Sequence, residues 1–520
     1  MNRYIGTPDS SGRTELAGPA RESDVTPQLG KAQCSAGTAP PPPMRVLLVN
    51  PNRVKPAIAP IGLDYLADAL EAAGHTFELL DLCFSDDLAA DTVAAVRCAA
   101  PEAIGVTVRN TDDCYWSSQT FYLPEVKRVV ALLHQCAAAP VVLGGVGFSV
   151  APAAILDYCG ADFGLAGEGE LAFIAFLQAM ERRRGWQGVP GLIYRDHRTL
   201  RQNPTRAVNL TQLPPRRRAL VDNPRYFREG GQAGFETKRG CAMRCRYCAD
   251  PVAKGRTTRL VSPRLVVGEL SALLAQGIDH FHTCDSEFNL PPEHAVAVCQ
   301  ALLDAGLGQR LRWYAYAAPA PFTDELAGLC RRAGCVGINF GADSGSNKVL
   351  RRLGRHFKAE DLVNTAGLCR RHGLLCMFDL LLGGPGETRT TVRQTIELMR
   401  RVGPDCVGLS LGVRLYAGTP LARSLRARGE WSAQPDLHGV REANPALLAP
   451  VFYISPAVKE DLIGWVQELV GGDARFFLPA DTATHQNYNY NYNANNILVE
   501  AIARGARGAY WDILRRLRGA

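Results

Sequence analysis

The stretch Gly240-Cys-Ala-Met-Arg-Cys-Arg-Tyr-Cys248 decides how this 520-residue sequence is interpreted. It holds three of the chain's 16 cysteines and directly follows an apolar strand pattern. Three thiolates can ligate three irons of a cubane cluster and leave the fourth iron open. A zinc knuckle would need a fourth Cys or His close by, and residues 249–279 contain neither. The spacing therefore predicts a [4Fe-4S] cluster bound by Cys241, Cys245 and Cys248.

Strand and helix patterns alternate around this loop. Six such units between residues 235 and 425 predict a partial (β/α)6 barrel, which places chemistry at the carboxyl ends of its strands. The strands are expected at Phe235–Lys238, His280–Thr283, Arg312–Tyr316, Gly337–Phe340, Cys376–Leu381 and Cys406–Leu411. Loops suited to a site follow at Asp285-Ser-Glu-Phe-Asn289, Gly341-Ala-Asp-Ser-Gly345, Gly383-Gly-Pro-Gly-Glu-Thr388 and Arg414-Leu-Tyr-Ala-Gly-Thr-Pro-Leu421.

A second strand–helix alternation precedes the barrel and predicts a flavodoxin-like, doubly wound α/β domain. Its glycine loops, Gly144-Gly-Val-Gly-Phe-Ser149 and Gly164-Leu-Ala-Gly-Glu-Gly-Glu170, allow close backbone approach by a nucleotide or phosphate tail. The loop Arg109-Asn-Thr-Asp-Asp113 points toward the same crevice. The strands are expected at Val46–Val49, Phe77–Asp81, Ile104–Val108, Val141–Gly144 and Phe163–Ala166.

Composition divides the rest of the chain. A stretch rich in Gly, Ser, Thr, Ala and Pro predicts a disordered N-terminal extension, which makes Met44 a candidate start. Arginine runs such as Arg182–Arg184 and Arg216–Arg218 are expected on a solvated surface. The predicted division is 1–43 extension, 44–185 first domain, 186–234 connector with a hairpin at Leu192–Tyr194, 235–425 barrel, and 426–520 small, mainly helical cap.

Charge and hydropathy exclude several classes. The net charge of +7 is small for this length and gives no nucleic-acid groove. No apolar run approaches the ~20 residues of a membrane helix, and the N-terminus lacks the apolar core of a secretory signal. A cytoplasmic protein is expected, without membrane or nucleic-acid partners. Apart from the three cysteines of the cluster motif and Cys284, the remaining twelve cysteines are then expected to be small buried thiols.

The C-x3-C-x-aromatic-C spacing and the strand-end loops resemble the radical S-adenosylmethionine (SAM) superfamily. In that family the open iron binds the amino and carboxylate groups of SAM. The resemblance implies that Tyr247 lies near the adenine, that Asp343 and Ser344 contact SAM, and that Gly384 lies near it. From the residues alone, plain turns at 343–345 and 383–386 remain open alternatives.

Residues 44–185 resemble the cobalamin-binding domain that precedes the barrel in one radical SAM branch. The shared stretches are Val46-Leu-Leu-Val-Asn-Pro51, Pro60-Ile-Gly-Leu-Asp-Tyr-Leu66 and the two glycine loops. Many such domains carry a cobalt-ligating His in Asp-x-His-x-x-Gly, but Asn50–Pro60 contains no His. Cobalamin without a histidine ligand is therefore expected. The implied contacts are Arg109, Asn110, Gly144, Gly145, Gly147, Ser149, Gly167 and Glu168.

The loop around Arg109 resembles that of cobalamin-dependent radical SAM methylases, including the tryptophan 2-methylating branch. Arg109 is implied beneath the corrin without ligating cobalt, because a guanidinium has no lone pair to donate. A surface ion pair of Arg109 with Asp112 is the alternative.

The resemblance implies a methyltransferase that uses a [4Fe-4S] cluster, SAM and cobalamin on a small, natural-product-type substrate. A flavodoxin- or ferredoxin-type reductant is implied, and radical and polar methyl transfer both remain open. The alternatives are cyclisation or rearrangement without methyl transfer, and a non-enzymatic cobalamin or redox sensor. A nucleic-acid methylthiolating enzyme would need further clustered cysteines and a basic RNA module.

Several residues keep two interpretations. Cys284 is either a catalytic thiol or a buried small side chain. Trp313, Tyr314 and Tyr316 either stack on an aromatic substrate or belong to the core, and core is the commoner role of strand aromatics. The tract Gln486–Asn493 is either a polar substrate-facing loop or the lead-in to a helix.

Overall fold

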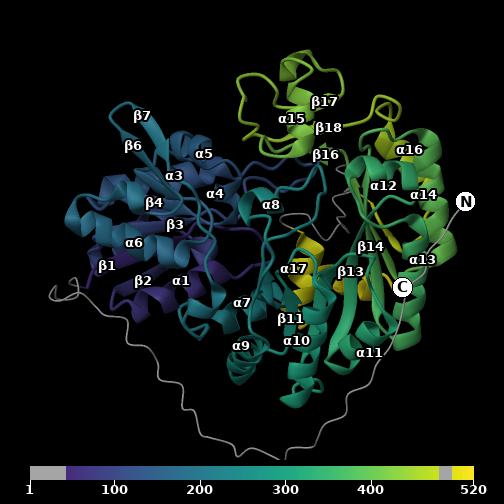
Figure 1. The fold of residues 1–520 in the computed structure, drawn as a ribbon, viewed down its shortest axis with the longest axis horizontal. Coiled ribbons are helices and arrows are strands. Elements are labelled where there is room, and N and C mark those ends of the chain that lie inside the picture. The colour runs from purple at the N-terminus through teal and green to yellow at the C-terminus, as the bar shows by residue number, and fades with distance from the viewer. Residues whose placement is uncertain (1–42, 479–494, 520) are drawn as a thin grey trace, which may run out of the picture. The chain divides into compact units, whose positions relative to one another are not determined.

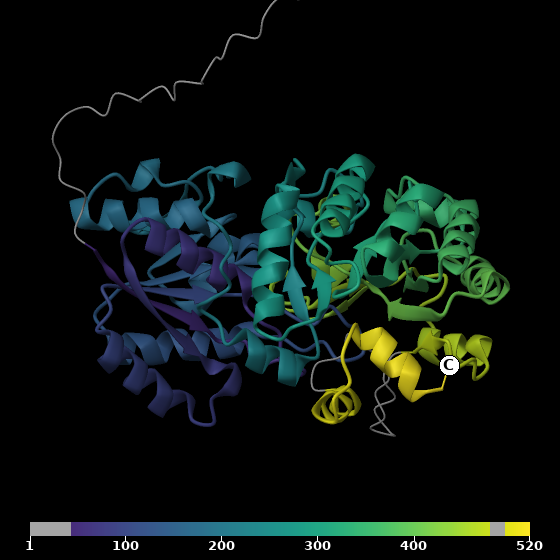
Figure 2. The ribbon, with the colours of Figure 1, turned by 90° about the horizontal axis from the view of Figure 1, so that it is seen from below.

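The computed structural model describes residues 43–478 and 495–519 (Figure 1). The expected extension before residue 43 and the tract Gln486–Asn493 lie outside the described residues. Two parallel sheets with helical layers organise the described chain, and a small antiparallel sheet and further helices follow them (Figures 1 and 2). No helix in the described ranges has the length and apolarity that crossing a membrane requires.

The first sheet confirms the flavodoxin-like prediction. Its strand order is β2-β1-β3-β4-β5-β6-β7, and the first five strands run parallel. The predicted hairpin is present as β6 and β7, which pair antiparallel to β5 and so extend this sheet. The strands are β1 Arg45–Asn50, β2 Thr76–Asp81, β3 Ala103–Thr107, β4 Val141–Gly144, β5 Phe163–Leu165, β6 Leu192–Asp196 and β7 Thr199–Gln202.

Alternating side chains of β1 explain why helices cover both faces of this sheet. Leu47 and Val49 pack into one apolar core with α2, α3 and α5, whereas Val46 and Leu48 pack into another with α1 and α6. A strand that is apolar on both sides needs a helical layer on each. The helices are α1 Ile61–Ala72, α2 Leu88–Ala99, α3 Leu123–Cys136, α4 Val146–Val150, α5 Pro152–Cys159 and α6 Gly169–Arg182.

The second sheet is the predicted partial barrel. Its order is β19-β15-β14-β13-β12-β11-β8, with every pairing parallel and no closure between the two edge strands. The first predicted strand is split, because the chain leaves the sheet after Phe235 and forms β9 against β10. The strands are β8 Ala233–Phe235, β9 Lys238–Arg239, β10 Arg259–Leu260, β11 His280–Thr283, β12 Arg312–Ala317, β13 Cys335–Asp343, β14 Leu375–Leu382, β15 Cys406–Leu411 and β19 Phe476–Phe477.

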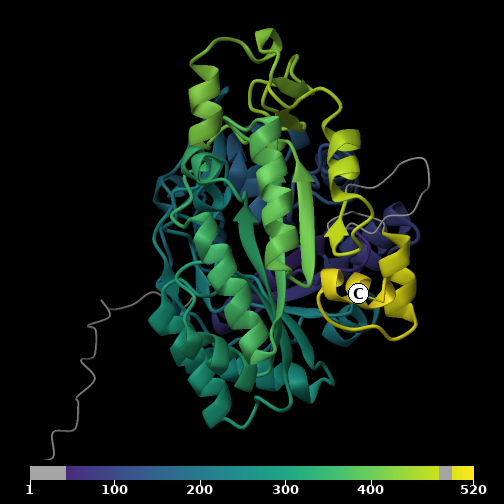
Figure 3. The same ribbon diagram turned by 90° about the vertical axis from the view of Figure 1, so that its right-hand side faces the viewer.

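Helices form the outer layer of this barrel (Figure 3). Their apolar faces and the outward residues of the strands build the largest core of the described chain. The helices between α7 and α14 are α7 Asn223–Gly230, α8 Asp250–Ala253, α9 Pro263–Ala275, α10 Pro292–Asp304, α11 Asp324–Arg332, α12 Asn347–Leu353, α13 Ala359–His372 and α14 Arg389–Val402.

The C-terminal region is helical, as predicted, but it also contains a small sheet. Strands β16 Val413–Arg414, β18 Val451–Tyr453 and β17 Leu437–Gly439 pair antiparallel. Trp511 and Leu514 of the last helix pack with Tyr314 and Met377, on the inward face of the barrel strands. The tail thereby fills part of the barrel's concave side. The helices are α15 Pro420–Arg426, α16 Leu462–Val470, α17 Asn496–Ala503 and α18 Tyr510–Leu517.

The arginine run at 216–218 lies differently from the prediction of a solvated surface. Arg216 and Arg218 are buried, and the Arg217 side chain is 51% exposed. Arg218 bonds Asp64 of α1 and Glu269 of α9, at 2.9 and 2.8 Å. The expectation was wrong because carboxylates from two distant helices converge on this connector.

Candidate functional site

The three cluster cysteines line one cavity of about 150 Å³. Cys241 and Cys245 are buried, and the Arg355 Nη1 atom lies 3.0 Å from the Cys245 Sγ atom. In the described ranges no three Cys, His, Asp or Glu side chains are placed to share a single ion. In a cubane cluster each thiolate binds a different iron, so the three cysteines need not share one ion. The donor set therefore fits a cubane cluster with one open iron.

The loop can take this path because Gly240 has a positive φ of 80°. A Cβ atom there would lie 2.2 Å from the Thr257 carbonyl oxygen, so no other residue fits without movement. The Cys241 amide donates to the Gly255 carbonyl at 3.1 Å. These contacts fix the start of the cysteine loop against the segment that follows it.

Charged side chains surround the thiols. Tyr247 donates its hydroxyl to Asp343 at 2.7 Å, and Asp343 pairs with Arg355 at 3.3 Å. Arg355 also pairs with Glu287 at 3.6 Å, and burial raises the pKa of Glu287 to about 7. Both Arg355 and Glu287 line the cavity, although neither was a predicted site residue. Glu287 could have been found from its strand-end loop, whereas nothing in the sequence marks Arg355.

The residues that the family resemblance places near SAM fall into two groups. Tyr247 lines the cavity, and Asp343 contacts two of the residues that line it. Ser344 is fully buried, and its hydroxyl accepts from the Ser346 amide at 3.1 Å. Gly384 donates its amide to Glu387 at 3.2 Å. The structure thus brings the first pair to the cavity and uses the second pair in turns.

A larger cavity of about 370 Å³ lies at the carboxyl ends of the first sheet's strands. Residues of the barrel segment close its other side, among them Lys238, Lys254 and Cys284. Six of the residues implied as cobalamin contacts line it, namely Arg109, Asn110, Gly144, Gly145, Gly167 and Glu168. Gly147 and Ser149 do not line the cavity, but they belong to the loop and helix that hold its lining residues in place.

The glycines at 145 and 147 pack so closely against the backbone that follows β3 that no side chain fits there. Gly145 has a φ of 97°, and a Cβ atom there would lie 2.7 Å from the Val108 carbonyl oxygen. A Cβ atom on Gly147 would lie 2.8 Å from the Arg109 backbone. The Ser149 hydroxyl donates to the Gly145 carbonyl at 2.8 Å and accepts from the Gly167 amide at 2.9 Å. The two loops are thereby tied together, with bare backbone facing the cavity, which fits a nucleotide tail.

Arg109 remains available to the cavity. The alternative of an Arg109–Asp112 ion pair is wrong, because Asp112 accepts from Arg414 at 2.8 and 3.0 Å. Within the described ranges Arg109 enters no ion pair. It forms part of the wall of the large cavity and of a neighbouring one of about 140 Å³.

The structure distinguishes between the two interpretations of Cys284 and of the aromatic residues of the third barrel strand. Cys284 is exposed to the large cavity, so it is not a buried core thiol. Trp313 and Tyr314 belong to the core, whereas Tyr316 is 41% exposed and lines the cysteine cavity. Of the other described cysteines, eight are buried as expected, and Cys98 and Cys114 are exposed while Cys136 is intermediate.

Ser286 lines both the large cavity and the cysteine cavity. Its hydroxyl donates to Asp250 at 2.5 Å, and Lys254 donates to the same carboxylate oxygen at 3.0 Å. Asp250 lines the cysteine cavity and Lys254 the large one. The two cavities are therefore neighbours across a small polar cluster.

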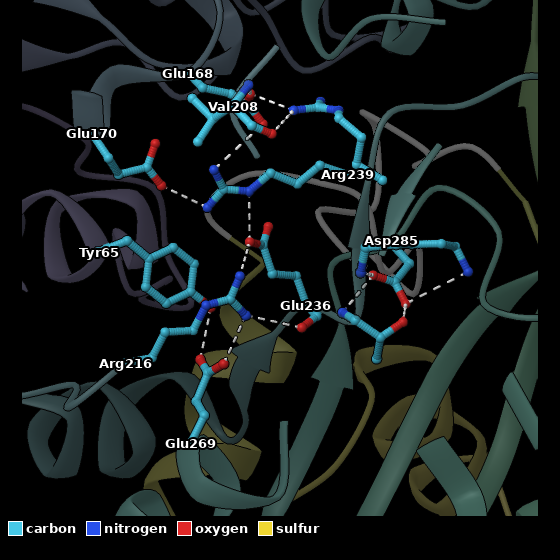
Figure 4. Close-up of polar contacts among 12 residues, drawn as sticks. Tyr65, Glu168, Glu170, Val208, Arg216, Glu236, Arg239, Glu269 and Asp285 are labelled. Atoms are coloured by element: carbon cyan, nitrogen blue, oxygen red, sulfur yellow. Dashed lines mark hydrogen bonds and ion pairs between the residues drawn. The ribbon is translucent and has the colours of Figure 1, made fainter. Parts of the chain in front are cut away.

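A buried ionic network joins the first domain to the barrel beside these cavities (Figure 4). The Tyr65 hydroxyl of α1 donates to Glu269 at 2.7 Å, and Arg216 pairs with the same carboxylate at 3.0 Å. Arg239 of β9 pairs with Glu170 and with Glu236, each at 2.7 Å. Such a network fixes the two halves of the large cavity relative to each other.

Glu168 belongs to this network. Its carboxylate pairs with Arg239 at 3.5 Å and with Arg259, and it accepts from the Val208 amide at 2.7 Å. Glu168 thus lines the cavity with its charge already neutralised by two arginines.

Comparison with known proteins agrees with this arrangement. The family model "Radical SAM superfamily" matches residues 235–399, and "B12 binding domain" matches residues 49–177. A tryptophan 2-C-methyltransferase from Streptomyces laurentii is 35% identical over 443 residues, which cover 73% of this chain and 74% of that protein.

Two solved structures are similar. The radical SAM methyltransferase TsrM from Kitasatospora setae, with tryptophan and a SAM analog bound, is 32% identical with a TM-score of 0.83, and the match covers 91% of this chain and 97% of that one. The cobalamin-dependent SAM radical enzyme OxsB, at 17% identity, TM-score 0.67, and coverage of 79% of this chain and 64% of that one, shares the fold. With its cysteine loop, its glycine loops and these relatives, the chain belongs to the cobalamin-dependent radical SAM methyltransferases.

Proposed function

We propose that the protein transfers a methyl group to a ring carbon of a small aromatic substrate, with an aromatic amino acid such as tryptophan as the first compound to test. One observation carries this proposal: the cysteine cavity and the glycine-lined cavity adjoin at Ser286. A substrate held there reaches groups bound in both cavities at once. Proximity of this kind is a large part of what an enzyme contributes to a reaction between bound groups.

The aromatic character of the substrate rests on Tyr316 and His282. Their rings are tilted, with centroids 4.6 Å apart, and 41% of Tyr316 is exposed in the cysteine cavity. An exposed aromatic ring beside a second ring offers a stacking surface for a planar substrate. The relatives from Streptomyces laurentii and Kitasatospora setae are associated with tryptophan by name and by bound substrate, respectively.

When bound, the cluster, SAM and cobalamin supply the one-electron and methyl-transfer chemistry. The chain holds and separates them. Cys241, Cys245 and Cys248 hold the cluster, and the buried guanidinium of Arg355 offsets negative charge on Cys245. The glycine loops at 144–147 and 167 take the nucleotide tail of cobalamin. Arg109 provides a cation at the cavity wall without a lone pair for cobalt.

We also propose the boundaries of the domains and a cytoplasmic location for the protein. Pairing of β6 with β5 supports a cobalamin domain that continues past residue 185 to about residue 202. The barrel then extends to about residue 425, and the cap follows it.

The described cysteines are free thiols, which suits a reducing cytoplasm. Reduction of the cluster by one electron needs an external donor, since nothing in the methyl transfer itself supplies that electron.

The test is anaerobic incubation of the reconstituted enzyme with tryptophan, a reductant and SAM labelled in its methyl group. The expected product is methyltryptophan that carries the label. A tryptophan-derived product without the label would point to cyclisation or rearrangement. Bound cofactors without any product from a panel of indole and other aromatic amino acids would contradict the proposal.

A matched pair of variants tests the meeting point of the cavities. Ser286→Val should lower kcat/KM for methyl transfer at least about tenfold, because it removes the hydrogen bond to Asp250 and narrows the passage. Thr283→Val is the control, since its buried hydroxyl has no hydrogen-bond partner among the described residues and the two side chains are isosteric. Iron and cobalamin contents should match the wild type in both variants.

A further inference from the structure

Five exposed basic side chains gather on the outer side of the cysteine loop. Arg244 and Arg246 flank Cys245 in the sequence, and Lys348, Arg351 and Arg352 stand on α12. Lys348 is three and four residues from the other two, so all three share one face of the helix. These five residues are called the basic patch.

Backbone contacts bring the two halves of the basic patch together. The Arg246 amide donates to the Leu353 carbonyl at the end of α12, at 2.9 Å. A Cβ atom on Gly354 would lie 2.5 Å from the Arg244 carbonyl oxygen and 3.2 Å from the Arg246 Cγ atom. The cysteine loop and the end of α12 are therefore in direct contact, and their basic side chains form one surface.

The charges of the basic patch are not neutralised locally. None of its five side chains takes part in an ion pair with any residue of the described ranges. Arg355, the next arginine after α12, contrasts with them, because it is buried and paired with Asp343 and Glu287. Like charges three or four residues apart destabilise a helix. The helix dipole favours Arg351 and Arg352 in the last turn of α12, but five unpaired like charges on one surface repel one another and attract an anionic partner.

The basic patch lies where an electron can enter. Cys245 is buried and lines the cluster cavity, while its two sequence neighbours reach the surface. None of the five basic residues is among those that line the two cavities around Ser286. A protein docked on the patch touches the segment that holds the cluster and leaves the substrate cavity open.

We propose that the basic patch is the docking surface for an acidic one-electron carrier protein of the flavodoxin type. The inference rests on the proposed function only in taking Cys245 as a cluster ligand. In the transfer the reduced carrier loses one electron and the cluster gains one, with no bond or proton exchanged. Transient redox encounters use small interfaces. Opposite charge then steers them and raises association rates by about 10- to 1,000-fold.

The test measures cluster reduction in the holoenzyme. Reduced flavodoxin is mixed anaerobically with the wild type and with the double variant Lys348→Glu/Arg351→Glu, and the loss of cluster absorbance is followed by stopped flow. The double variant should be reduced at least about tenfold more slowly at low salt. The wild-type rate should fall as salt rises, because exposed charges are screened. Photoreduction by a small neutral deazaflavin should proceed equally in both proteins.

The control is Arg97→Glu/Arg128→Glu, which makes the same change in net charge on α2 and α3 of the first domain. Both of these arginines are exposed and outside any ion pair of the described chain. This control should be reduced by flavodoxin at the wild-type rate. Iron and cobalamin contents, measured before mixing, confirm that each variant is loaded.

Three outcomes would overturn the proposal. In the first, flavodoxin reduces the cluster of the wild type and of the patch variant at the same rate. In the second, the control variant is slowed as much as the patch variant. In the third, flavodoxin does not reduce the wild-type cluster although deazaflavin does. Loss of RNA binding by the patch variant, with unchanged reduction by flavodoxin, would assign the patch to nucleic acid instead. Because the assay follows the cluster and not the product, it stays informative even where no methyl transfer is found.

Discussion

Replacement of Arg218 by Met tests whether the buried ionic network holds the first domain on the barrel. The Arg218 side chain is 0% exposed and donates to Asp64, Glu269, the Gly234 carbonyl and Asn223, over distances of 2.8 to 3.0 Å. Methionine approximates the apolar part of the side chain and removes the charge. Asp64 and Glu269 then stay buried without this cation.

Breaking a buried pair by removal of one partner costs about 3–5 kcal/mol. Part of this loss is offset, because Asp64 still accepts from the Leu220 and Val221 amides and Glu269 still pairs with Arg216. We therefore expect about 3 kcal/mol for Arg218→Met, at the lower end of this range. Arg217→Met is the matched control. Its side chain is 51% exposed, and its buried partner Asp68 keeps the hydrogen bond from the Arg217 amide, so we expect a smaller loss of about 1 kcal/mol.

Urea unfolding under anaerobic conditions measures both variants, followed by tryptophan fluorescence. Urea is preferred to guanidinium because it leaves ion pairs unscreened. Arg218→Met should lower the midpoint clearly more than Arg217→Met, and adding Asp64→Asn should restore part of the loss by removing one unpaired charge. Equal midpoints for the two single variants would refute the argument that the network stabilises the contact between domain and barrel.

Three shorter predictions concern the site. Cys241→Ala should lose the cluster and all turnover, and about four irons per chain retained in the triple cysteine variant would refute the assignment. The cobalt(II) paramagnetic spectrum of the purified protein should lack splitting from a nitrogen ligand. Arg109→Lys should slow remethylation of cobalamin, while the cobalamin content of the protein stays near normal. Burial raises the pKa of Glu387 to about 7, so the folded state retains a proton that the unfolded state has lost. Glu387 alone should then lower the free energy of unfolding by about 3 kcal/mol from pH 4.5 to 7. Glu387→Gln should remove this part of the slope in urea midpoints measured across that range and leave the part that Glu287 contributes.

Much of the architecture could be predicted because its signals are local. The apolar run at Val46–Val49 and the helix pattern after it predict a parallel sheet without reference to any other part of the chain. The strand at Phe235–Lys238 was less accurate. Its last residue, Lys238, pairs with Leu260 instead, and the apolar pattern does not reveal this competing partner.

Parts of the site could not be predicted because their partners are far away in the sequence. Arg414 and Asp112 form a buried pair across 302 positions, which also rules out the alternative in which Asp112 pairs with Arg109. Arg355 reaches Cys245 across 110 positions. An isolated Arg or Asp in a sequence carries no mark of such a partner, and an exposed arginine run is the commoner case.

The sequence by itself determined which groups are present: three thiols spaced for a cluster, glycines where only bare backbone fits, and no histidine in the loop after the first strand. These features depend on residues that are neighbours in the chain, so local geometry is enough to define them. Only the tertiary structure decided that Ser286 stands between the two cavities, that Arg216 and Arg218 are buried, and that the basic patch forms at the cysteine loop. The physical reason is that burial and ion pairing depend on which distant surfaces meet, and the packing of the two sheets and their helices settles that.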